Sequence, residues 1–180
     1  MTTLYLLRHG ETEENARHIL QGNMPGHLSA EGRRQVQEAA ERLRLVSFDA
    51  LLSSDLQRCV DTAHLVLQAW TSGDEPAATQ TEKIQLRQTP LLRERDWGSA
   101  TGMVVDGVHK ITIPADAESM KAIKVRAQTL LDFVRDDYPS QTVLAISHGL
   151  FCRVLQAVHY GKDMADIERM GNAEHRILHL

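Results

Sequence analysis

The chain has 180 residues, of which 42% are hydrophobic and 24% charged, and its formal net charge is −4. This length allows one domain with a buried core, so we predict a single domain over residues 1–180 of the soluble globular class. The acidic balance argues against a broad basic surface for nucleic acid, and the absence of about 20 consecutive apolar residues argues against a membrane span.

The first part of the chain is expected to alternate strands with helices. Apolar runs over residues 4–7 and 48–52 predict two buried strands. After a loop rich in Gly, Asn and Pro over 21–28, Ser29 is expected to cap one helix, and Ser54 to cap another. Helical spacing assigns Val36, Ala39, Ala40 and Leu43 to the buried face of the first helix, and Cys59, Ala63, Val66, Leu67 and Trp70 to that of the second.

The middle of the chain is less regular. Residues 72–81 are polar and contain Gly and Pro, which predicts a surface loop. Alternation of apolar and polar residues over 84–88 predicts a third, more exposed strand. Residues 98–118 contain glycines, a proline and a short β-like piece around 111–113, and we interpret them as a small cap excursion within the domain.

A long amphipathic helix is expected to begin at Ser119 and to stop before Pro139. Its predicted buried face consists of Ile123, Ala127, Leu130, Leu131 and Val134. After it we expect, in order, a strand over 142–146, a helix over 150–160 ended by Gly161, a short helix over 163–170 and a last strand over 176–180. This alternation predicts an α/β fold, a three-layer α/β/α sandwich with a mostly parallel sheet.

Two of the predicted strands end in the same way. The first leads into Arg8-His9-Gly10, and the strand over 142–146 leads into Ser147-His148-Gly149. The carboxyl ends of parallel strands share one edge of a sheet, where ligands bind. If these strands are neighbours, His9 and His148 face each other there. Each glycine lets the backbone approach a ligand closely, and the helix after His148 favours anions at its N-terminus.

Two arginines belong to the same edge. Arg8 adjoins His9, and Arg58 lies in the first turns of the helix that follows the second strand. The planar guanidinium fork suits phosphate, so two arginines and two histidines predict a compact cationic pocket for a phosphate group.

Five segments in order resemble the histidine phosphatase superfamily, which contains cofactor-dependent phosphoglycerate mutase. The resemblance covers most of the chain apart from the excursion. Its segments are Leu7-Arg8-His9-Gly10-Glu11-Thr12 with Asn15; Gln21-Gly22 and Leu28-Ser29 with Gly32; Ser53-Ser54-Asp55-Leu56-Gln57-Arg58 with Thr62-Ala63; Leu92-Arg93-Glu94-Arg95-Asp96-Trp97-Gly98 with Gly102; and Ser147-His148-Gly149.

The resemblance implies a role for each matched residue. His9 would be the nucleophile that becomes phosphorylated, and Glu94 would donate a proton to the leaving oxygen. The phosphoryl group would be held by Arg8, Arg58, His148, Asn15 and the Gly149 amide, with Thr12, Gln21 and Gly22 lining the mouth.

The chemistry suits these groups. A neutral imidazole is a nucleophile near pH 7, and fixed arginines together with a cationic His148 would complement the phosphoryl charge. A carboxylic acid lets the alcohol depart neutral. Because arginines neutralise the charge, we expect no metal and no cofactor, and the other histidines show no three-ligand grouping.

Some assignments stay open at this point. Glu11 competes with Glu94 as the proton donor, and Trp97 either lines the mouth or packs. The two cysteines, Cys59 and Cys152, have no metal-like spacing and fit a reducing compartment. The apolar run at the N-terminus is too short for a signal segment, so we expect a cytoplasmic protein.

The excursion distinguishes mutases from phosphatases within the family. Mutases of this family carry an arginine pair and a lysine after the segment that contains the proton donor, which here is 92–98. In this chain, residues 98–117 hold only Lys110 as a permanently charged base. A short cap also implies an open pocket. We therefore expect a phosphatase acting on a small phosphorylated metabolite. The alternatives are a phosphoglycerate mutase or sugar bisphosphatase, a phosphohistidine protein phosphatase, and a non-catalytic regulatory homologue.

Overall fold

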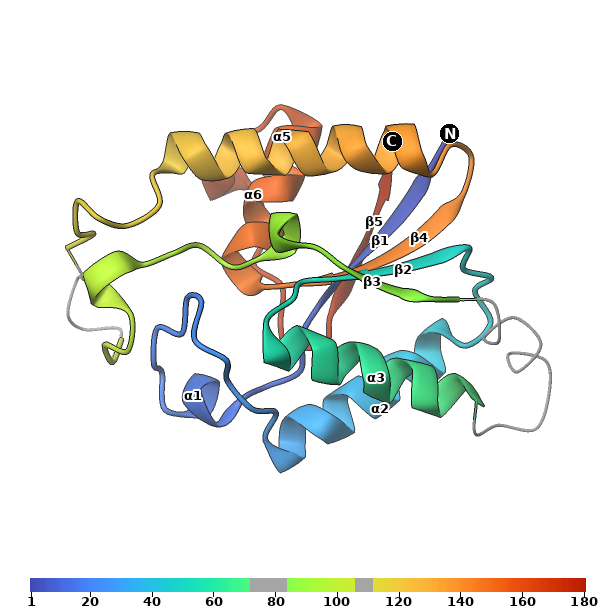
Figure 1. Ribbon diagram of the computed structural model, residues 1–180, viewed down its shortest axis with the longest axis horizontal. Helices are drawn as coiled ribbons and strands as arrows, with labels where there is room; N and C mark the ends of the chain where they lie inside the picture. Colours follow the sequence, from blue (N-terminus) through green and yellow to red (C-terminus); the bar gives the residue numbers. More distant parts are fainter. Residues whose placement is uncertain (72–83, 106–111) are drawn as a thin grey trace.

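A mostly parallel sheet forms the centre of the molecule in the computed structural model, which describes residues 1–71, 84–105 and 112–180 (Figure 1). Within these residues the sheet has five strands in the order β3-β2-β4-β1-β5. Only β5 runs antiparallel to its neighbour, β1. The strands are β1 (Thr3–Arg8), β2 (Ala50–Ser53), β3 (Leu86–Gln88), β4 (Thr142–Ser147) and β5 (His175–His179).

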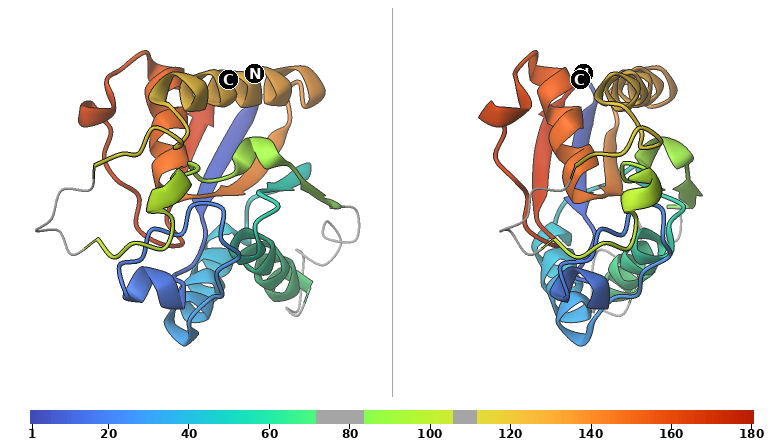
Figure 2. Two further views of the ribbon diagram at one scale, coloured as in Figure 1. Left: turned by 60° about the vertical axis from the view of Figure 1, so that its left-hand side comes forward. Right: turned by 90° about the vertical axis from the view of Figure 1, so that its left-hand side faces the viewer.

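Helices cover both faces of this sheet. Figure 2 shows α2 and α3 on one side and α5 and α6 on the other, which confirms the predicted three-layer α/β/α sandwich. The helices are α1 (Glu13–Ala16), α2 (Ala30–Leu43), α3 (Gln57–Thr71), α5 (Met120–Asp137) and α6 (Gly149–Tyr160), and the 3-10 turns are η1 (Pro90–Leu92), η2 (Gly98–Ala100) and η3 (Met164–Asp166).

The core is divided between the two faces because successive strand residues point to opposite sides. In β1, Leu4 and Leu6 belong to the cluster under α5 and α6, whereas Leu7 belongs to the cluster over α2 and α3. All three side chains are fully buried. The strands therefore read as continuous apolar runs, as buried parallel strands do.

Helix boundaries follow the predicted capping residues closely. The Ser119 hydroxyl accepts the Ala122 N–H at 3.1 Å at the start of α5. All five residues predicted for the buried face of this helix are buried. The Ser29 hydroxyl likewise accepts the Gly32 N–H at 2.9 Å, and α6 ends at Gly161, whose φ of 61° is left-handed.

Three predictions near the second strand need correction. The strand β2 begins at Ala50, after the buried Phe48. Ser54 is not the cap of α3, because its hydroxyl accepts the Leu56 N–H in the turn before the helix, at 3.3 Å. Leu67 on α3 is only half-buried, unlike the rest of the predicted stripe.

Other corrections concern the segments away from the sheet. The helix predicted over 163–170 is only the 3-10 turn η3. The β-like piece around 111–113 is not a strand at 112–113, while residue 111 and the predicted loop over 72–81 lie outside the described residues. No helix among the described residues is long and apolar enough to cross a membrane.

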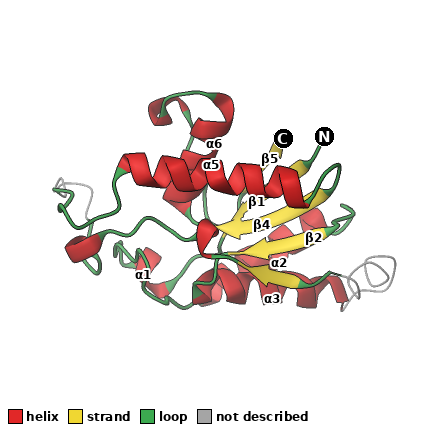
Figure 3. Cartoon of the chain, turned by 45° about the horizontal axis from the view of Figure 1, so that its top comes forward, coloured by secondary structure: helices red, strands yellow, loops and turns green. Residues whose placement is uncertain are grey.

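The topology brings the two His-Gly strand ends together. Strand β1 pairs with β4 in parallel, with Arg8 opposite Ser147. The next residues, His9 and His148, are therefore neighbours at the edge to which the strand arrows point in Figure 3. The two ends of the chain lie side by side at the start of β1, where the Thr2 N–H donates a hydrogen bond to the Leu180 carbonyl at 3.1 Å (Figure 1).

Candidate active site

Two buried imidazoles lie against each other at the carboxyl ends of β1 and β4. The ring centroids of His9 and His148 are 5.1 Å apart, with an interplanar angle of 63°. His9 is 3% exposed and His148 is 0% exposed. The predicted juxtaposition of the two histidines is therefore present.

The protonation state of His9 follows from its hydrogen bond. Nδ1 lies 2.7 Å from the Gly10 carbonyl oxygen, which can only accept, so Nδ1 carries the hydrogen. Burial first, and then the charges of Arg58 and Arg8, hold the pKa of His9 well below its usual range. Nε2 consequently has a free lone pair, and within the described parts of the chain it has no hydrogen-bond partner.

His148 is neutral as well, which corrects the expectation of a cationic second histidine. Its Nδ1 accepts the Nε–H of Arg58 at 3.1 Å, so its Nε2 carries the hydrogen and donates to the Ser54 hydroxyl at 2.9 Å. Burial, followed by the charges of Arg58 and then His9, holds the pKa of His148 well below its usual range. The imidazole thus orients Arg58 without adding positive charge.

Arg58 holds a loop over the site. Its Nη2 donates to the Gly22 carbonyl at 2.7 Å and its Nη1 to the Met24 carbonyl at 2.6 Å. A longer contact of 3.4 Å reaches the Pro25 carbonyl. With Nε bonded to His148, one N–H on Nη2 is left for a ligand.

Arg8 presents a buried donor without a partner. Its Nη1 donates to the Met170 carbonyl at 2.7 Å, but its Nε is buried and unbonded. A side chain at position 149 would begin 3.1 Å from this Nε, so only glycine leaves the space open. Unpaired buried donors are costly, and a bound anion would satisfy this one.

These groups surround a small cavity of about 120 Å³. Most residues predicted for the site line it, together with two apolar residues, Ile19 and Leu20, that carry no recognisable sequence signal. The lining residues are Arg8, His9, Asn15, Ile19, Leu20, Gln21, Gly22, Arg58, Glu94, Trp97 and Gly149. Trp97, left open by the sequence, thus lies at the site.

Two predicted residues do not line this cavity. Thr12 is fully buried, and its hydroxyl accepts the Asn15 N–H at 3.1 Å and the Gln21 Nε2–H at 2.7 Å. It caps α1 and places Asn15 and Gln21, so its expected position at the mouth is wrong. His148 contacts the cavity residues His9 and Arg58 instead of the cavity itself.

Glu94 lies at the N-terminus of α6. Its carboxylate accepts the backbone N–H groups of Leu150 at 3.2 Å and Phe151 at 3.1 Å. The competing carboxylate, Glu11, accepts the Ser29 hydroxyl at 2.8 Å and is not among the residues that line the cavity. Of the two candidates, Glu94 therefore has the position that a proton donor needs.

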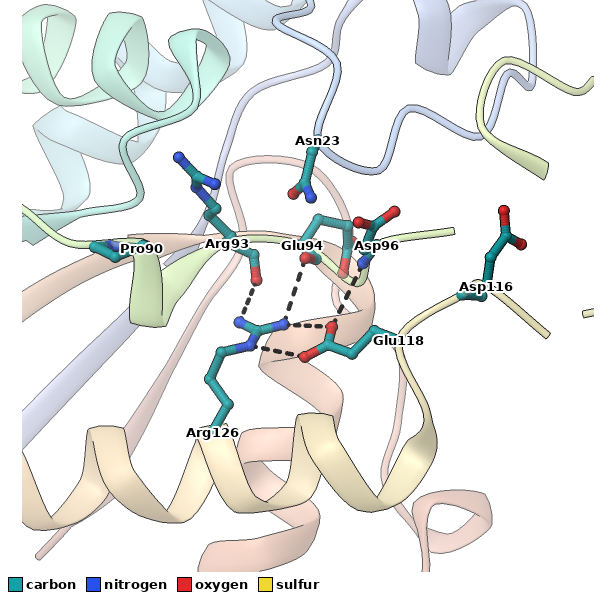
Figure 4. A pocket seen from close by; sticks show the side chains of 9 residues that line it. Asn23, Pro90, Arg93, Glu94, Asp96, Asp116, Glu118 and Arg126 are labelled. Atoms are coloured by element: carbon teal, nitrogen blue, oxygen red, sulfur yellow. Dashed lines mark hydrogen bonds and ion pairs between the residues drawn. The ribbon is translucent and has the colours of Figure 1, made fainter. Parts of the chain in front are cut away.

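The sequence analysis missed Arg126 on α5, which fixes the backbone next to Glu94 (Figure 4). Its Nη1 donates to the Arg93 carbonyl at 2.7 Å, and its Nη2 forms an ion pair of 2.8 Å with Glu118. Its guanidinium also lies 4.4 Å from the ring centre of Phe151. In the sequence, Arg126 is one more charged residue on an amphipathic helix, so nothing distinguishes it.

Neither cysteine lines the cavity at His9, and the described side chains of the site do not form a metal centre. Cys59 is buried, with its Sγ 3.4 Å from Nε2 of His148, and burial raises the pKa of its thiol. Over the ranges that the structure describes, no three His, Cys, Asp or Glu side chains gather as a metal site would require.

Comparison with known proteins identifies the family of the chain. The family model described as "Histidine phosphatase superfamily (branch 1)" matches residues 4–180. Among curated relatives, "Probable phosphoglycerate mutase GpmB" of Salmonella arizonae is 31% identical over 154 residues, covering 83% of this chain and 71% of the relative. "Uncharacterized phosphatase PhoE" of Bacillus subtilis is 28% identical over 166 residues, covering 91% and 80%.

Solved structures show the same fold. YhfR of Bacillus stearothermophilus superposes with a TM-score of 0.85 at 24% identity, covering 100% of this chain and 92% of that one. A mycobacterial glucosyl-3-phosphoglycerate phosphatase, solved in complex with VO3, gives a TM-score of 0.80 at 26% identity, covering 98% and 92%.

Proposed function

This chain belongs to the histidine phosphatase superfamily, and we propose that within it the chain is a metal-independent phosphomonoesterase acting through a phosphohistidine. The observation that carries the proposal is the tautomer of His9. The Gly10 carbonyl holds the hydrogen on Nδ1, so the Nε2 lone pair is available as a nucleophile.

In the first step, the phosphoryl group of the substrate occupies the cavity of about 120 Å³. The unbonded Nε of Arg8, the remaining N–H of Arg58 and the Gly149 amide donate to its oxygens. Nε2 of His9 attacks phosphorus and the ester P–O bond breaks. Glu94, in its carboxylic acid form, protonates the departing oxygen so that a neutral alcohol leaves.

In the second step, water takes the place of the alcohol. The Glu94 carboxylate accepts a proton from this water as it attacks phosphorus, and the bond from phosphorus to Nε2 breaks. Orthophosphate leaves, the electron pair returns to His9, and Glu94 is again protonated. Guanidinium groups and amides carry the charge stabilisation in both steps, so the scheme requires no metal ion.

Hydrolysis is favoured over mutase activity by the surroundings of Glu94. The described parts of the excursion, 98–105 and 112–117, contain no arginine or lysine, whereas mutases of this family carry basic residues in this stretch. The cavity of about 400 Å³ on that side of Glu94 is lined by Asp96, Asp116 and Glu118 together with Arg93 and Arg126. Both arginines are already paired with carboxylates of the protein, Arg93 with Asp55 and Arg126 with Glu118. Relatives with phosphatase names also support this reading.

The test is turnover of 4-nitrophenyl phosphate and of an alkyl phosphate by the purified protein in the presence of a chelator. We expect release of phosphate by the wild type, background rates in His9→Ala, and wild-type rates in the control His64→Ala, which removes an exposed histidine on α3. Acid-labile phosphate should appear on the wild type after rapid quenching.

Equal rates in the wild type and His9→Ala would refute the proposal. Activity that depends on added metal would refute its metal-independent form. Isomerisation of phosphoglycerate faster than its hydrolysis, after priming with a bisphosphate, would reassign the chain to the mutases.

A further inference from the structure

A second cavity, of about 400 Å³, adjoins the one at His9. The two share Arg8, Leu20, Glu94, Trp97 and Gly149 as lining residues. Because the proposed proton donor lies in the shared wall, the leaving oxygen of a substrate must be near it. The alcohol part of the ester would then extend into the second cavity.

The walls of this second cavity have two chemical characters. Leu20, Trp97, Leu150 and Met170 provide apolar surface next to the phosphoryl site. Two further arginines, Arg153 on α6 and Arg169 on the loop after η3, also line it. Such a cavity favours a ligand with an apolar body and a charged group.

These two arginines have donors available for a ligand. The Nε of Arg153 donates to the Ile167 carbonyl at 2.7 Å, which fixes the guanidinium in place. In the described part of the chain, Arg153 makes no other hydrogen bond and no ion pair, and Arg169 makes neither. Both Nη groups of Arg153 are therefore free, and such a fixed fork binds carboxylate or phosphate well.

One loop connects these arginines to the phosphoryl site. The Met170 carbonyl accepts from Nη1 of Arg8 at 2.7 Å, three residues after the carbonyl that holds Arg153. The segment from Ile167 to Met170 is thus bonded at one end to Arg153 and at the other to the arginine that faces the transferred phosphate. A single rigid segment therefore sets the spacing between two anion-binding groups.

We propose that Arg153 and Arg169 form a subsite for a second anionic group on the alcohol part of the substrate. The substrate class is a phosphomonoester with a hydrocarbon or aromatic body that ends in a carboxylate or a second phosphate. This inference rests on the proposed function, since it assumes that the transferred phosphate lies at His9.

Binding of phosphonates measures the subsite directly, because their carbon–phosphorus bond is not hydrolysed. Calorimetry would compare ω-carboxyalkyl phosphonates of increasing length with the matching ω-carbamoyl compounds, in which a neutral amide replaces the carboxylate. We expect the wild type to prefer the carboxylate at one optimal length by about tenfold or more, the scale of a charged hydrogen-bonded pair. The same chains ending in a second phosphonate distinguish a phosphate from a carboxylate.

Three variants assign the preference to its residues. Arg169→Gln and Arg153→Gln should each reduce the ratio of carboxylate to amide affinity to near one. The control Arg33→Gln removes the same charge from the exposed face of α2 and should retain the ratio. Arg169 makes no contact within the described residues that its loss would disturb, so that variant remains informative if Arg153→Gln folds poorly.

Equal affinity of the wild type for acid and amide at every length would overturn the subsite, as would a ratio unchanged in both arginine variants. Failure of the proposed function is a separate result. A protein that prefers the carboxylate but hydrolyses no ester above His9→Ala keeps the subsite and loses the phosphatase assignment.

Discussion

Replacement of Glu94 by glutamine tests the proposed proton donor separately from the rest of the site. The backbone N–H groups of Arg95 at 2.9 Å and Phe151 at 3.1 Å both donate to Oε1, and Leu150 donates to Oε2. A glutamine carbonyl can keep the first two bonds, so the side chain should stay in place. Its NH2 group is too weak an acid to protonate a departing alkoxide.

The size of the effect depends on the leaving group. For an alkyl phosphate, whose alkoxide leaves poorly, loss of general acid catalysis should lower the rate of the first step, transfer of the phosphoryl group to His9, by about 10² to 10⁴. For 4-nitrophenyl phosphate, whose phenolate is a stable anion, we expect this first step to slow by less than about tenfold, since little protonation is needed. The ratio of the two rates is therefore the informative quantity.

The assay is single-turnover release of the alcohol from both esters by the wild type, Glu94→Gln and Glu11→Gln, which measures the first step without the hydrolysis of the phosphohistidine. The second variant is a matched control, because Glu11 accepts the Ser29 hydroxyl and does not line the cavity. An equal decrease of this first step for both esters in Glu94→Gln would show that Glu94 does not protonate the leaving oxygen. A selective loss on the alkyl ester in Glu11→Gln would identify Glu11 as the donor instead.

Three further predictions follow from the contacts around the site. Arg126→Gln, which releases the backbone next to Glu94, should slow the first step on alkyl phosphates by about tenfold to a hundredfold and slow it less on 4-nitrophenyl phosphate, and a uniform loss of this step would show a general folding defect. The depressed pKa values of His9 and His148 mean that the unfolded chain binds more protons than the folded one below about pH 6.5. The free energy of unfolding should therefore fall as the pH falls below this value, by up to about 2.7 kcal/mol per pH unit for the two groups, and denaturant titrations that show a flat profile would contradict this. Gly32→Ala would place a carbon 1.9 Å from a backbone oxygen and should cost about 3 kcal/mol, whereas Gly171→Ala, 3.5 Å from its nearest neighbour, should change the free energy of unfolding by less than about 0.5 kcal/mol.

The sequence predicted the fold well where local patterns and burial agree. Ser119 both caps α5 and precedes a regular apolar stripe, so the start of the helix and its buried face were correct. The segment 163–170 has the same kind of apolar spacing but is not a helix. Its carbonyls at Ile167 and Met170 accept from Arg153 and Arg8, so these long-range bonds replace the local ones that a helix would make.

The identity of the site residues was more predictable than their charges and contacts. Strand ends and helix starts placed His9 and Arg58 at one sheet edge, and the family resemblance added Glu94. In the structure all three line one cavity. The tautomer of His148 depends on a bond from Arg58, 90 positions away in the sequence, and no local pattern encodes it. The role of Arg126 also depends on contacts with residues distant in the sequence, so no local pattern indicates it.

The order of strands in the sheet has a consequence for how the protein is made. Strand β1 carries His9 but pairs only with β4 and β5, which come last in the sequence. A growing chain that has not reached Thr142 can pair β2 with β3, but it leaves β1 without a partner. The proposed nucleophile, His9, is therefore synthesised first and positioned last, and a chain cut short before β4 loses the site as a whole.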